Sequence, residues 1–211
     1  MTTQPLLIQF AKWPEKGRVK TRLVPALGEA GALEAHIRLT QAVLGQLMAA
    51  GGPLTLWWNG ELPQPPPEAP PIISRLTENG IPQGVQSGSN LGERMQQALE
   101  AGIASHGAAI IVGSDCPSVD PDYIERARAA LAGADVVLGP ADDGGFVLIG
   151  ARRTCDGMLS GVEWGTPRAL EQTLTQLEKK GLRHACLEPL WDVDEPGDWA
   201  RFLSAGAGSK G

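Results

Sequence analysis

The chain has 211 residues, 42% of them hydrophobic and 20% charged, a composition typical of a globular protein with a substantial core. Its net charge of −6 disfavours a general nucleic-acid binder, because such a protein needs a broad basic surface. No apolar run approaches the roughly 20 residues that cross a bilayer, and the first one is too short for a signal peptide, so we expect a cytoplasmic protein without a membrane span.

Short apolar runs alternate with amphipathic segments in the first half of the chain. The runs at 5–11 and 54–59 predict buried strands, and the apolar residues of 28–50 recur at helical spacing between them. Residues 60–71 contain six prolines, which predicts a loop with polyproline character. After a short segment without a clear pattern, an apolar residue at every fourth position from Leu91 to Ile103 predicts a second amphipathic helix.

The same alternation continues in the second half. The run at 108–115 is continuously apolar, which is typical of a strand buried on both faces of a parallel sheet. We expect helices at 118–133 (capped by Ser118 or Asp120), at 165–181 and from about Glu195, and strands at 134–140, 144–151 and 183–194. Strands alternating with helices predict an open α/β sheet with helices on both faces.

Five basic residues follow the first predicted strand, namely Lys12, Lys16, Arg18, Lys20 and Arg22. They could form one solvated face of an edge strand. However, the segment contains a proline and a glycine and lies at the carboxyl end of a buried strand, where open α/β sheets bind ligands. Cations that converge there would repel one another without an anion, so the pattern favours a phosphate site. The spacing does not match a P-loop.

Acidic residues at other strand ends are candidate metal ligands. Asp115 ends the most apolar strand, where it is either capped by backbone N–H groups or meets a cation. Asp192 and Asp194 alternate along the late strand, so a regular strand would point them to opposite faces. Two carboxylates from separate strand ends would suit Mg²⁺ or Mn²⁺ completed by substrate phosphates.

A turn rich in aspartate and glycine lies at 142–145. Its residues are ordinary hairpin-turn residues. At the same end of the sheet, Gly144 and Gly145 would also admit close approach of a substrate, and Asp143 could accept a hydrogen bond from a hydroxyl or act as general base.

Together these segments resemble a bacterial family of GT-A-type transferases, many known only as a domain of unknown function or as nucleotide-diphospho-sugar transferases. The matching stretches are "FAKWPEKGRVKTRL", "GSNLGERM", "VGSDCP", "GPADDGGFVLIG" and "WDVDEPGDW". More distantly, the chain is similar to molybdenum cofactor guanylyltransferase and 2-phospholactate guanylyltransferase. The resemblance implies a three-layer α/β/α sandwich with a mostly parallel open sheet, in one nucleotide-binding transferase domain over 1–205, followed by a flexible tail at 206–211.

The resemblance also implies roles for individual residues. The nucleotide phosphates would contact Lys12, Arg18, Lys20 and Arg22, and Gly88, Gly92, Glu93 and Arg94 would border the base or ribose. Asp115 would replace the metal-binding acid of a D-x-D motif, of which only one acid is present here, so Asp194 is expected to complete the metal site. Lys20 and Asp143 would be catalytic, and Asp143, Gly144 and Gly145 would bind the acceptor.

Three activities remain open at this stage. A glycosyltransferase would move a sugar from a nucleotide-diphospho-sugar to a small-molecule acceptor, and it is favoured by the closer family. A nucleotidyltransferase would join a nucleoside triphosphate to a phosphorylated acceptor with release of pyrophosphate. A nucleotide-binding protein without catalysis is the third, and the single acid at position 115 is its best support.

Overall fold

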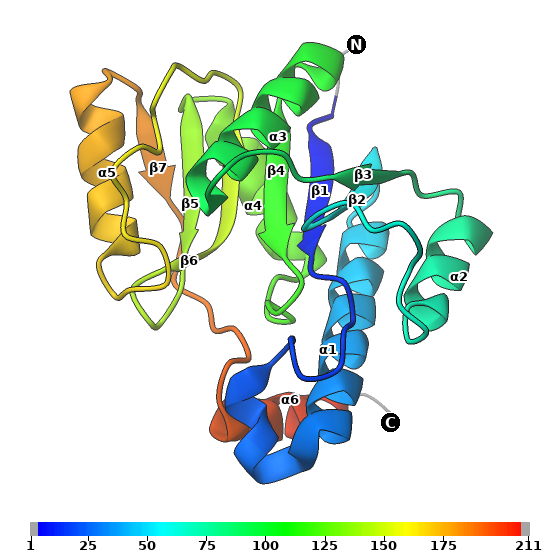
Figure 1. The fold of residues 1–211 in the computed structure, drawn as a ribbon. Coiled ribbons are helices and arrows are strands. Elements are labelled where there is room, and N and C mark those ends of the chain that lie inside the picture. The colour runs from blue at the N-terminus through cyan, green and yellow to red at the C-terminus, as the bar shows by residue number, and fades with distance from the viewer. Residues whose placement is uncertain (1–3, 208–211) are drawn as a thin grey trace.

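Seven strands form one open sheet in the order β3-β2-β1-β4-β6-β5-β7 (Figure 1). The computed structural model describes residues 4–207 of the chain. The strands are β1 (Leu6–Ala11), β2 (Leu54–Trp58), β3 (Gln83–Val85), β4 (Ala109–Gly113), β5 (Val136–Pro140), β6 (Phe146–Ala151) and β7 (His184–Cys186). All neighbouring strands are parallel except at β6, which is antiparallel to both β4 and β5.

Helices cover both faces of this sheet, so the predicted three-layer α/β/α arrangement is confirmed. They are α1 (Val24–Ala49), α2 (Pro70–Glu78), α3 (Leu91–His106), α4 (Pro121–Leu131), α5 (Ala169–Lys179) and α6 (Pro196–Ala207), with a short 3-10 helix η1 (Thr21–Leu23) before α1. Helices α1 and α4 pack on one face, whereas α3 and α5 pack on the other. No helix in residues 4–207 is long and apolar enough to cross a membrane.

The central strand β4 is continuously apolar because successive side chains enter two different cores. Ile110 packs against α1 and α4, whereas its neighbour Ile111 packs against α3 and α5. Both side chains are almost completely buried. Such a strand shows no polar alternation in sequence, as expected where both faces of a sheet are covered.

Side-chain caps fix the starts of two helices. The Asp120 side chain accepts a hydrogen bond from the Tyr123 N–H, as predicted, and Pro121 occupies the first turn of α4. Asn90 caps α3 in the same way by accepting from the Glu93 N–H. Each cap satisfies a backbone donor that the helix leaves without a partner, which is worth about 1 kcal/mol.

Several elements differ from the sequence predictions by more than shifts of a few residues at their ends. Helix α2 begins at Pro70, inside the predicted proline-rich loop, because proline is compatible with the first turn of a helix. The short edge strand β3 was not predicted. The late strand is limited to His184–Cys186 and does not reach 194. Helix α6 continues to Ala207, so 206 and 207 are helical, and the rest of the predicted tail lies outside the described residues.

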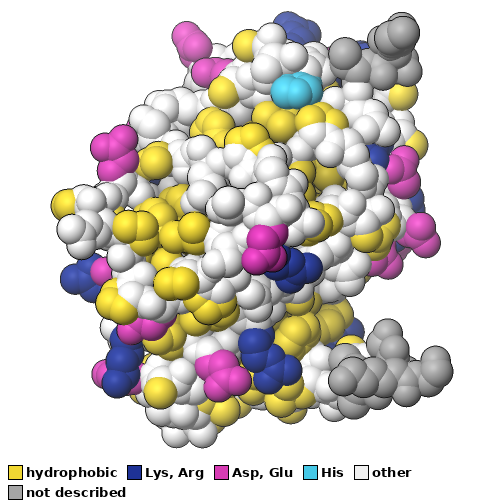
Figure 2. All heavy atoms as spheres, turned by 90° about the vertical axis from the view of Figure 1, so that its right-hand side faces the viewer, with side chains coloured by type: hydrophobic (Ala, Val, Ile, Leu, Met, Phe, Trp, Pro, Cys, Tyr) yellow, Lys and Arg dark blue, Asp and Glu magenta, His cyan; other side chains and the backbone are white. Residues whose placement is uncertain are grey.

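Among the described residues 4–207, the β3–α2 side of the molecule carries no continuous basic patch. Figure 2 shows this side with its charged side chains lying singly or in neighbouring acidic and basic pairs among uncharged atoms. This distribution agrees with the acidic net charge and gives a nucleic-acid backbone little to bind on this face.

We predict that Leu99→Ala lowers the free energy of unfolding by about 2–5 kcal/mol, because it leaves a cavity in a fully buried site of α3. Leu203→Ala is the matched control in a helix, since this leucine is 40% exposed and its truncation should cost less than about 0.5 kcal/mol. Urea denaturation of both variants measures the difference. Equal losses would contradict the assignment of the α3 face to the core.

Candidate functional site

A cavity of about 650 Å³ opens at the carboxyl ends of β1 and β4. The chain leaves β1 toward β2 and β3 on one side and later returns to β4 on the other side, so strand order reverses between these two strands. This is the position at which open α/β sheets bind their ligands. The volume is within the usual range for small-molecule sites.

The basic loop that follows β1 is anchored at both of its ends. Trp13 stacks on Trp58 with ring centroids 3.9 Å apart, and its indole N–H donates to the Gly60 carbonyl. Val19 and Leu23 are buried at the other end of the loop. The cations between these anchors are therefore held at the cavity by the apolar core.

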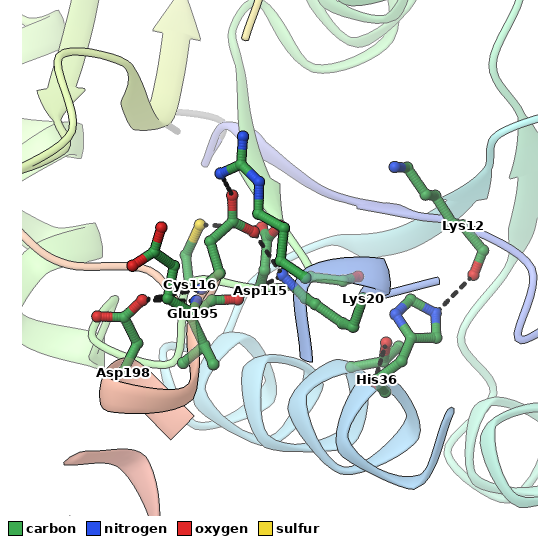
Figure 3. Close-up of polar contacts among 12 residues, drawn as sticks. Lys12, Lys20, His36, Asp115, Cys116, Glu195 and Asp198 are labelled. Carbon is green, nitrogen blue, oxygen red and sulfur yellow. Dashed lines mark hydrogen bonds and ion pairs between the residues drawn. The ribbon is translucent and has the colours of Figure 1, made fainter. Parts of the chain in front are cut away.

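Lys20 lies at the centre of the charged part of the cavity (Figure 3). Its ammonium is 3.1 Å from a carboxylate oxygen of Asp115 and 3.1 Å from one of Asp194. It also donates to the Val193 carbonyl. The side chain is only 8% exposed, so its three donors are directed at these partners and away from solvent.

Lys20 also has an unusual backbone conformation. Its φ of 45° makes it the one non-glycine residue with positive φ in the part of the chain that the structure describes. This conformation costs a side-chain-bearing residue about 1–3 kcal/mol, and it directs Lys20 toward the strand ends before η1 begins. Positive φ values outside glycine persist where surrounding contacts enforce them, and they concentrate at functional sites.

The ion pairs shift the pKa values of both partners in directions that favour their charged forms. Burial alone would lower the pKa of Lys20, but Asp115 and Asp194 outweigh it, and the pKa lies above its usual value. Burial raises the pKa of Asp115, yet the Lys20 ammonium outweighs this effect and the pKa lies below its usual value. The neighbouring thiol of Cys116 donates to Asp115, and burial raises the pKa of Cys116 well above its usual value.

Asp194 links a second cation to the same cluster. Its other carboxylate oxygen lies 3.1 Å from the Arg22 guanidinium, which is 65% exposed. The Asp198 carboxylate accepts from the Asp194 and Glu195 N–H groups and holds the segment that precedes α6. The two acids that were predicted as metal ligands, Asp115 and Asp194, therefore do lie together.

Asp192 joins these two acids, which contradicts the expectation that it points away from Asp194. That expectation required a regular strand, but strand pairing beyond β7 is limited to an isolated bridge at Leu190, and 191–195 have no strand conformation. One carboxylate oxygen from each of Asp115, Asp192 and Asp194 lies within 4.8 Å of the others. Burial, helped by the neighbouring carboxylates, raises the pKa of Asp192 to about 7.

The three carboxylates fit a divalent cation. They supply hard oxygen ligands from two separate segments, and the Asp192 carboxylate has no hydrogen-bond or ion-pair partner within residues 4–207. Mg²⁺ and Mn²⁺ prefer such ligands and usually complete their coordination with water and phosphate. A cation held by these carboxylates would take over the neutralising role that the Lys20 ammonium has in this structure.

The remaining cations of the loop are arranged differently. Lys12 and Arg18 line the cavity, but Arg18 also pairs with Glu15 at 3.2 Å. The Lys12 carbonyl accepts a hydrogen bond from His36, whose pKa is lowered by burial. Lys16 does not line the cavity and lies 4.0 Å from Glu29.

The residues predicted to border the base or ribose do not all lie at the main cavity. Arg94 lines the cavity, and its guanidinium donates to the Gly88 carbonyl at 3.1 Å and the Asn59 carbonyl at 3.4 Å. Gly88 does not line it, but a Cβ there would lie 2.9 Å from the Arg94 backbone nitrogen. Gly92 and Glu93 line a separate cavity beside α3. Of this predicted set, only Arg94 faces the main site.

The predicted acceptor residues are also divided. Asp143 and Gly145 line the main cavity, and the Asp143 carboxylate accepts from the Gly145 N–H at 2.8 Å. Gly144 instead packs against Pro167, where a Cβ would lie 2.2 Å from the carbonyl oxygen. The φ of Gly144 is 87°, so this close approach and this turn both require glycine.

The sequence reasoning did not select several further lining residues. Asn59 and Gln86 follow β2 and β3, while Phe146 and Trp164 contribute aromatic surface. Asn59 is the last residue of the strand predicted at 54–59 and could have been selected by the strand-end rule. Gln86 could not, because β3 was not predicted.

Solved structures with similar folds agree with this architecture. A "putative nucleotide-diphospho-sugar transferase" from Desulfovibrio desulfuricans G20 is 26% identical with a TM-score of 0.85, covering 97% of this chain and 88% of that one. A nucleotidyl transferase from Methanothermobacter thermautotroptrophicus is 14% identical with a TM-score of 0.60, covering 98% and 99%. Rv0371C from Mycobacterium tuberculosis H37Rv, in complex with manganese, is 17% identical with a TM-score of 0.52, covering 94% and 97%. The predicted GT-A (nucleotide-diphospho-sugar transferase) type of fold is confirmed.

Sequence comparison gives the family. No curated protein matches the chain. The profile described as "Uncharacterized protein conserved in bacteria (DUF2064)" matches residues 43–166, which is more than half of the length. The chain therefore belongs to the DUF2064 family of bacterial proteins.

Proposed function

We propose that this protein is a metal-dependent transferase that uses a nucleotide donor, and specifically a glycosyltransferase acting on a nucleotide-diphospho-sugar. The observation that carries the proposal is the charged cavity at the strand-order reversal, where the cations of the first loop face Asp115, Asp192 and Asp194. The similarity to the Desulfovibrio desulfuricans protein along almost the entire chain supports sugar transfer as the reaction.

Each part of the cavity would have a defined role in this reaction. Lys20, Arg22 and the exposed Lys12 and Arg18 would bind the donor diphosphate and stabilise the charge on the leaving nucleoside diphosphate. The three carboxylates would hold Mg²⁺ or Mn²⁺, which supplies Lewis-acid stabilisation of the same phosphates. The manganese complex of the mycobacterial protein supports this choice of ions. The exposed Asp143, which lines the cavity, would orient or deprotonate the acceptor hydroxyl.

Nucleotidyl transfer is the second candidate. The similar fold of the Methanothermobacter protein, which is named a nucleotidyl transferase, favours it, and four loop cations could also bind a triphosphate. In this reaction a phosphorylated acceptor would attack the α-phosphorus, and pyrophosphate would leave against the same cations.

We predict that nucleotide-diphospho-sugars raise the Tm of the protein in the presence of Mg²⁺ or Mn²⁺. A ligand at 100 times its Kd stabilises the folded state by about 2.7 kcal/mol. A thermal-shift screen of nucleotide-sugars and nucleoside triphosphates, followed by an assay for nucleoside diphosphate release, tests the donor class. Stabilisation by triphosphates alone, with pyrophosphate release, would establish nucleotidyl transfer, whereas binding without turnover of any donor would make the protein a non-catalytic nucleotide binder.

Lys20→Met should weaken donor binding by at least about tenfold, equivalent to about 1.4 kcal/mol, because it removes the buried cation and keeps the apolar stem. Lys16→Met is the matched control, since Lys16 belongs to the same loop but lies outside the cavity. Isothermal titration of donor into both variants measures the effect. If the two substitutions weaken binding equally, Lys20 has no particular role in phosphate binding.

Manganese affinity should rise with pH up to about 7 and then level, because a proton must leave Asp192 before the carboxylate can bind an ion. In Asp192→Asn the affinity should be lower and nearly independent of pH in this range. The raised pKa also predicts that the metal-free protein loses stability as pH rises from about 4 through 7, since the folded state holds this proton more tightly than the unfolded chain.

Manganese titrations between pH 5.5 and 8, and Tm values without metal, test both effects in the two proteins. Asp122→Asn, at an exposed position of α4, should behave as wild type. A wild-type affinity without pH dependence would contradict Asp192 as a ligand.

A further inference from the structure

The main cavity has an apolar part as well as a charged part. Leu91 and Met95 on α3 contribute to its wall, together with Phe146 at the start of β6 and Trp164 in the loop before α5. The Phe146 and Trp164 rings meet edge to face, with centroids 6.0 Å apart and planes at 83°. Asp143 and Gly145 lie immediately before Phe146, so the apolar wall adjoins the turn that carries the proposed hydroxyl-binding carboxylate.

Met95 is buried in the hydrophobic core, but the rest of this wall is only partly covered. Leu91 is 42% exposed, whereas Leu99, two helical turns later, is fully buried. Phe146 and Trp164 are only partly buried. Trp164 lines this cavity and also the separate cavity beside α3, and the edge of its indole that carries Nε1 lies against Gly92.

The neighbouring structure fixes the position of the indole. A Cβ at Gly92 would lie 2.9 Å from Cζ2 of Trp164, so the ring packs directly on the backbone of α3 at a residue without a side chain. The turn at 142–145 is joined to the start of α5 by the Leu170 N–H, which donates to the Gly144 carbonyl. The aromatic wall and Asp143 are therefore held by connected segments.

The apolar wall has no cation of its own. Four of the five lysines and arginines that line the cavity belong to the loop after β1, and the fifth, Arg94, donates to carbonyls beside β2 and β3. Arg168, close to Trp164 in sequence, pairs with Glu163 and does not line the cavity. A phosphate placed beside Phe146 would meet the negative charge of Asp143 and no compensating positive charge.

We propose that Leu91, Met95, Phe146 and Trp164 form the acceptor subsite and that the acceptor is an uncharged hydroxyl compound with an apolar face, such as an alkyl or aryl glycoside. This inference rests on the proposed glycosyl transfer and adds the class of acceptor. The acceptor oxygen forms a bond to the anomeric carbon of the donor sugar while the bond from that carbon to the diphosphate oxygen breaks. The bonding electron pair leaves with the nucleoside diphosphate, and the hydroxyl proton passes to the Asp143 carboxylate.

Binding of three probes to the full chain tests the subsite without a donor. With the phosphate-binding loop saturated by inorganic pyrophosphate, n-octyl β-D-glucoside and p-nitrophenyl β-D-glucoside should bind at least tenfold more tightly than glucose 6-phosphate in isothermal titration. Trp164→Ala should weaken the two glycosides at least tenfold, and Trp164→Phe, which keeps an aromatic ring, should weaken them less than about threefold. Tight binding of glucose 6-phosphate, or glycoside binding that Trp164→Ala leaves unchanged, would overturn the proposal.

Two variants at Leu91 keep the test decisive if Trp164→Ala does not fold. Leu91 is exposed at the first residue of α3, so substitution there should leave the fold intact. Leu91→Gln should weaken the glycosides several-fold, and Leu91→Lys should in addition strengthen glucose 6-phosphate binding relative to Leu91→Gln. Glycoside affinities that stay at the wild-type value in both variants would overturn the proposal.

The donor experiment separates this inference from the proposed function. Trp164→Ala and both Leu91 variants should retain the Tm shift caused by nucleotide-diphospho-sugars, because these residues are not part of the phosphate-binding region. Absence of that shift in the wild type contradicts the proposed function. If nucleotide-diphospho-sugars raise the Tm normally but the glycosides bind no more tightly than glucose 6-phosphate, only the proposed class of acceptor is contradicted.

Discussion

The ion-pair cluster around Lys20 holds the site together. The Lys20 ammonium joins the loop after β1 to the end of β4 and to the segment before α6. Its partners Asp115 and Asp194 lie 95 and 174 residues after Lys20 in the sequence. A nearly buried ammonium is costly without partners, and carboxylates this close together repel one another without a cation. The ammonium and the two carboxylates therefore stabilise one another in these positions. Their charges are balanced locally before any ligand binds.

The local charge balance also explains how an acidic chain can carry the group of cations that we propose binds phosphate. Lys20 and Arg22 pair with carboxylates of the site and Arg18 pairs with Glu15, whereas Lys12, at the same cavity, makes no ion pair within residues 4–207. A divalent ion on the carboxylates would release the Lys20 ammonium from part of its internal pairing and make it available to phosphate. Binding of the metal and binding of the phosphates would then favour each other, because each reduces the electrostatic cost of binding the other.

Most of the central sheet and its helices could be predicted from sequence because their signals are local. The apolar strand around Ile110 and the cap at Asp120 are examples, since each depends on adjacent residues. The grouping of Asp192 with Asp194 could not be predicted in this way. It depends on the chain leaving strand conformation after Cys186, apart from the isolated bridge at Leu190, and on contacts with distant segments such as the hydrogen bond from the Val193 N–H to the Asp115 carbonyl. The pairing of Lys16 with Glu29 has the same origin and removes one expected cation from the cavity.

Helix α1 is interrupted near its start, beside the segment that leads to α6. At Gly28 the backbone leaves helical geometry, with φ 69° and ψ 170°, and the turn before it packs with α6 in one small apolar cluster (Figure 1). Leu23, three residues after Lys20, and Val193, next to Asp194, are both buried in this cluster. Segment 23–39 and segment 191–202 thus share one apolar cluster, and we expect them to unfold together. A chain that stopped before Pro196 would keep every charged group of the site and lose the apolar support that holds Lys20 against Asp194.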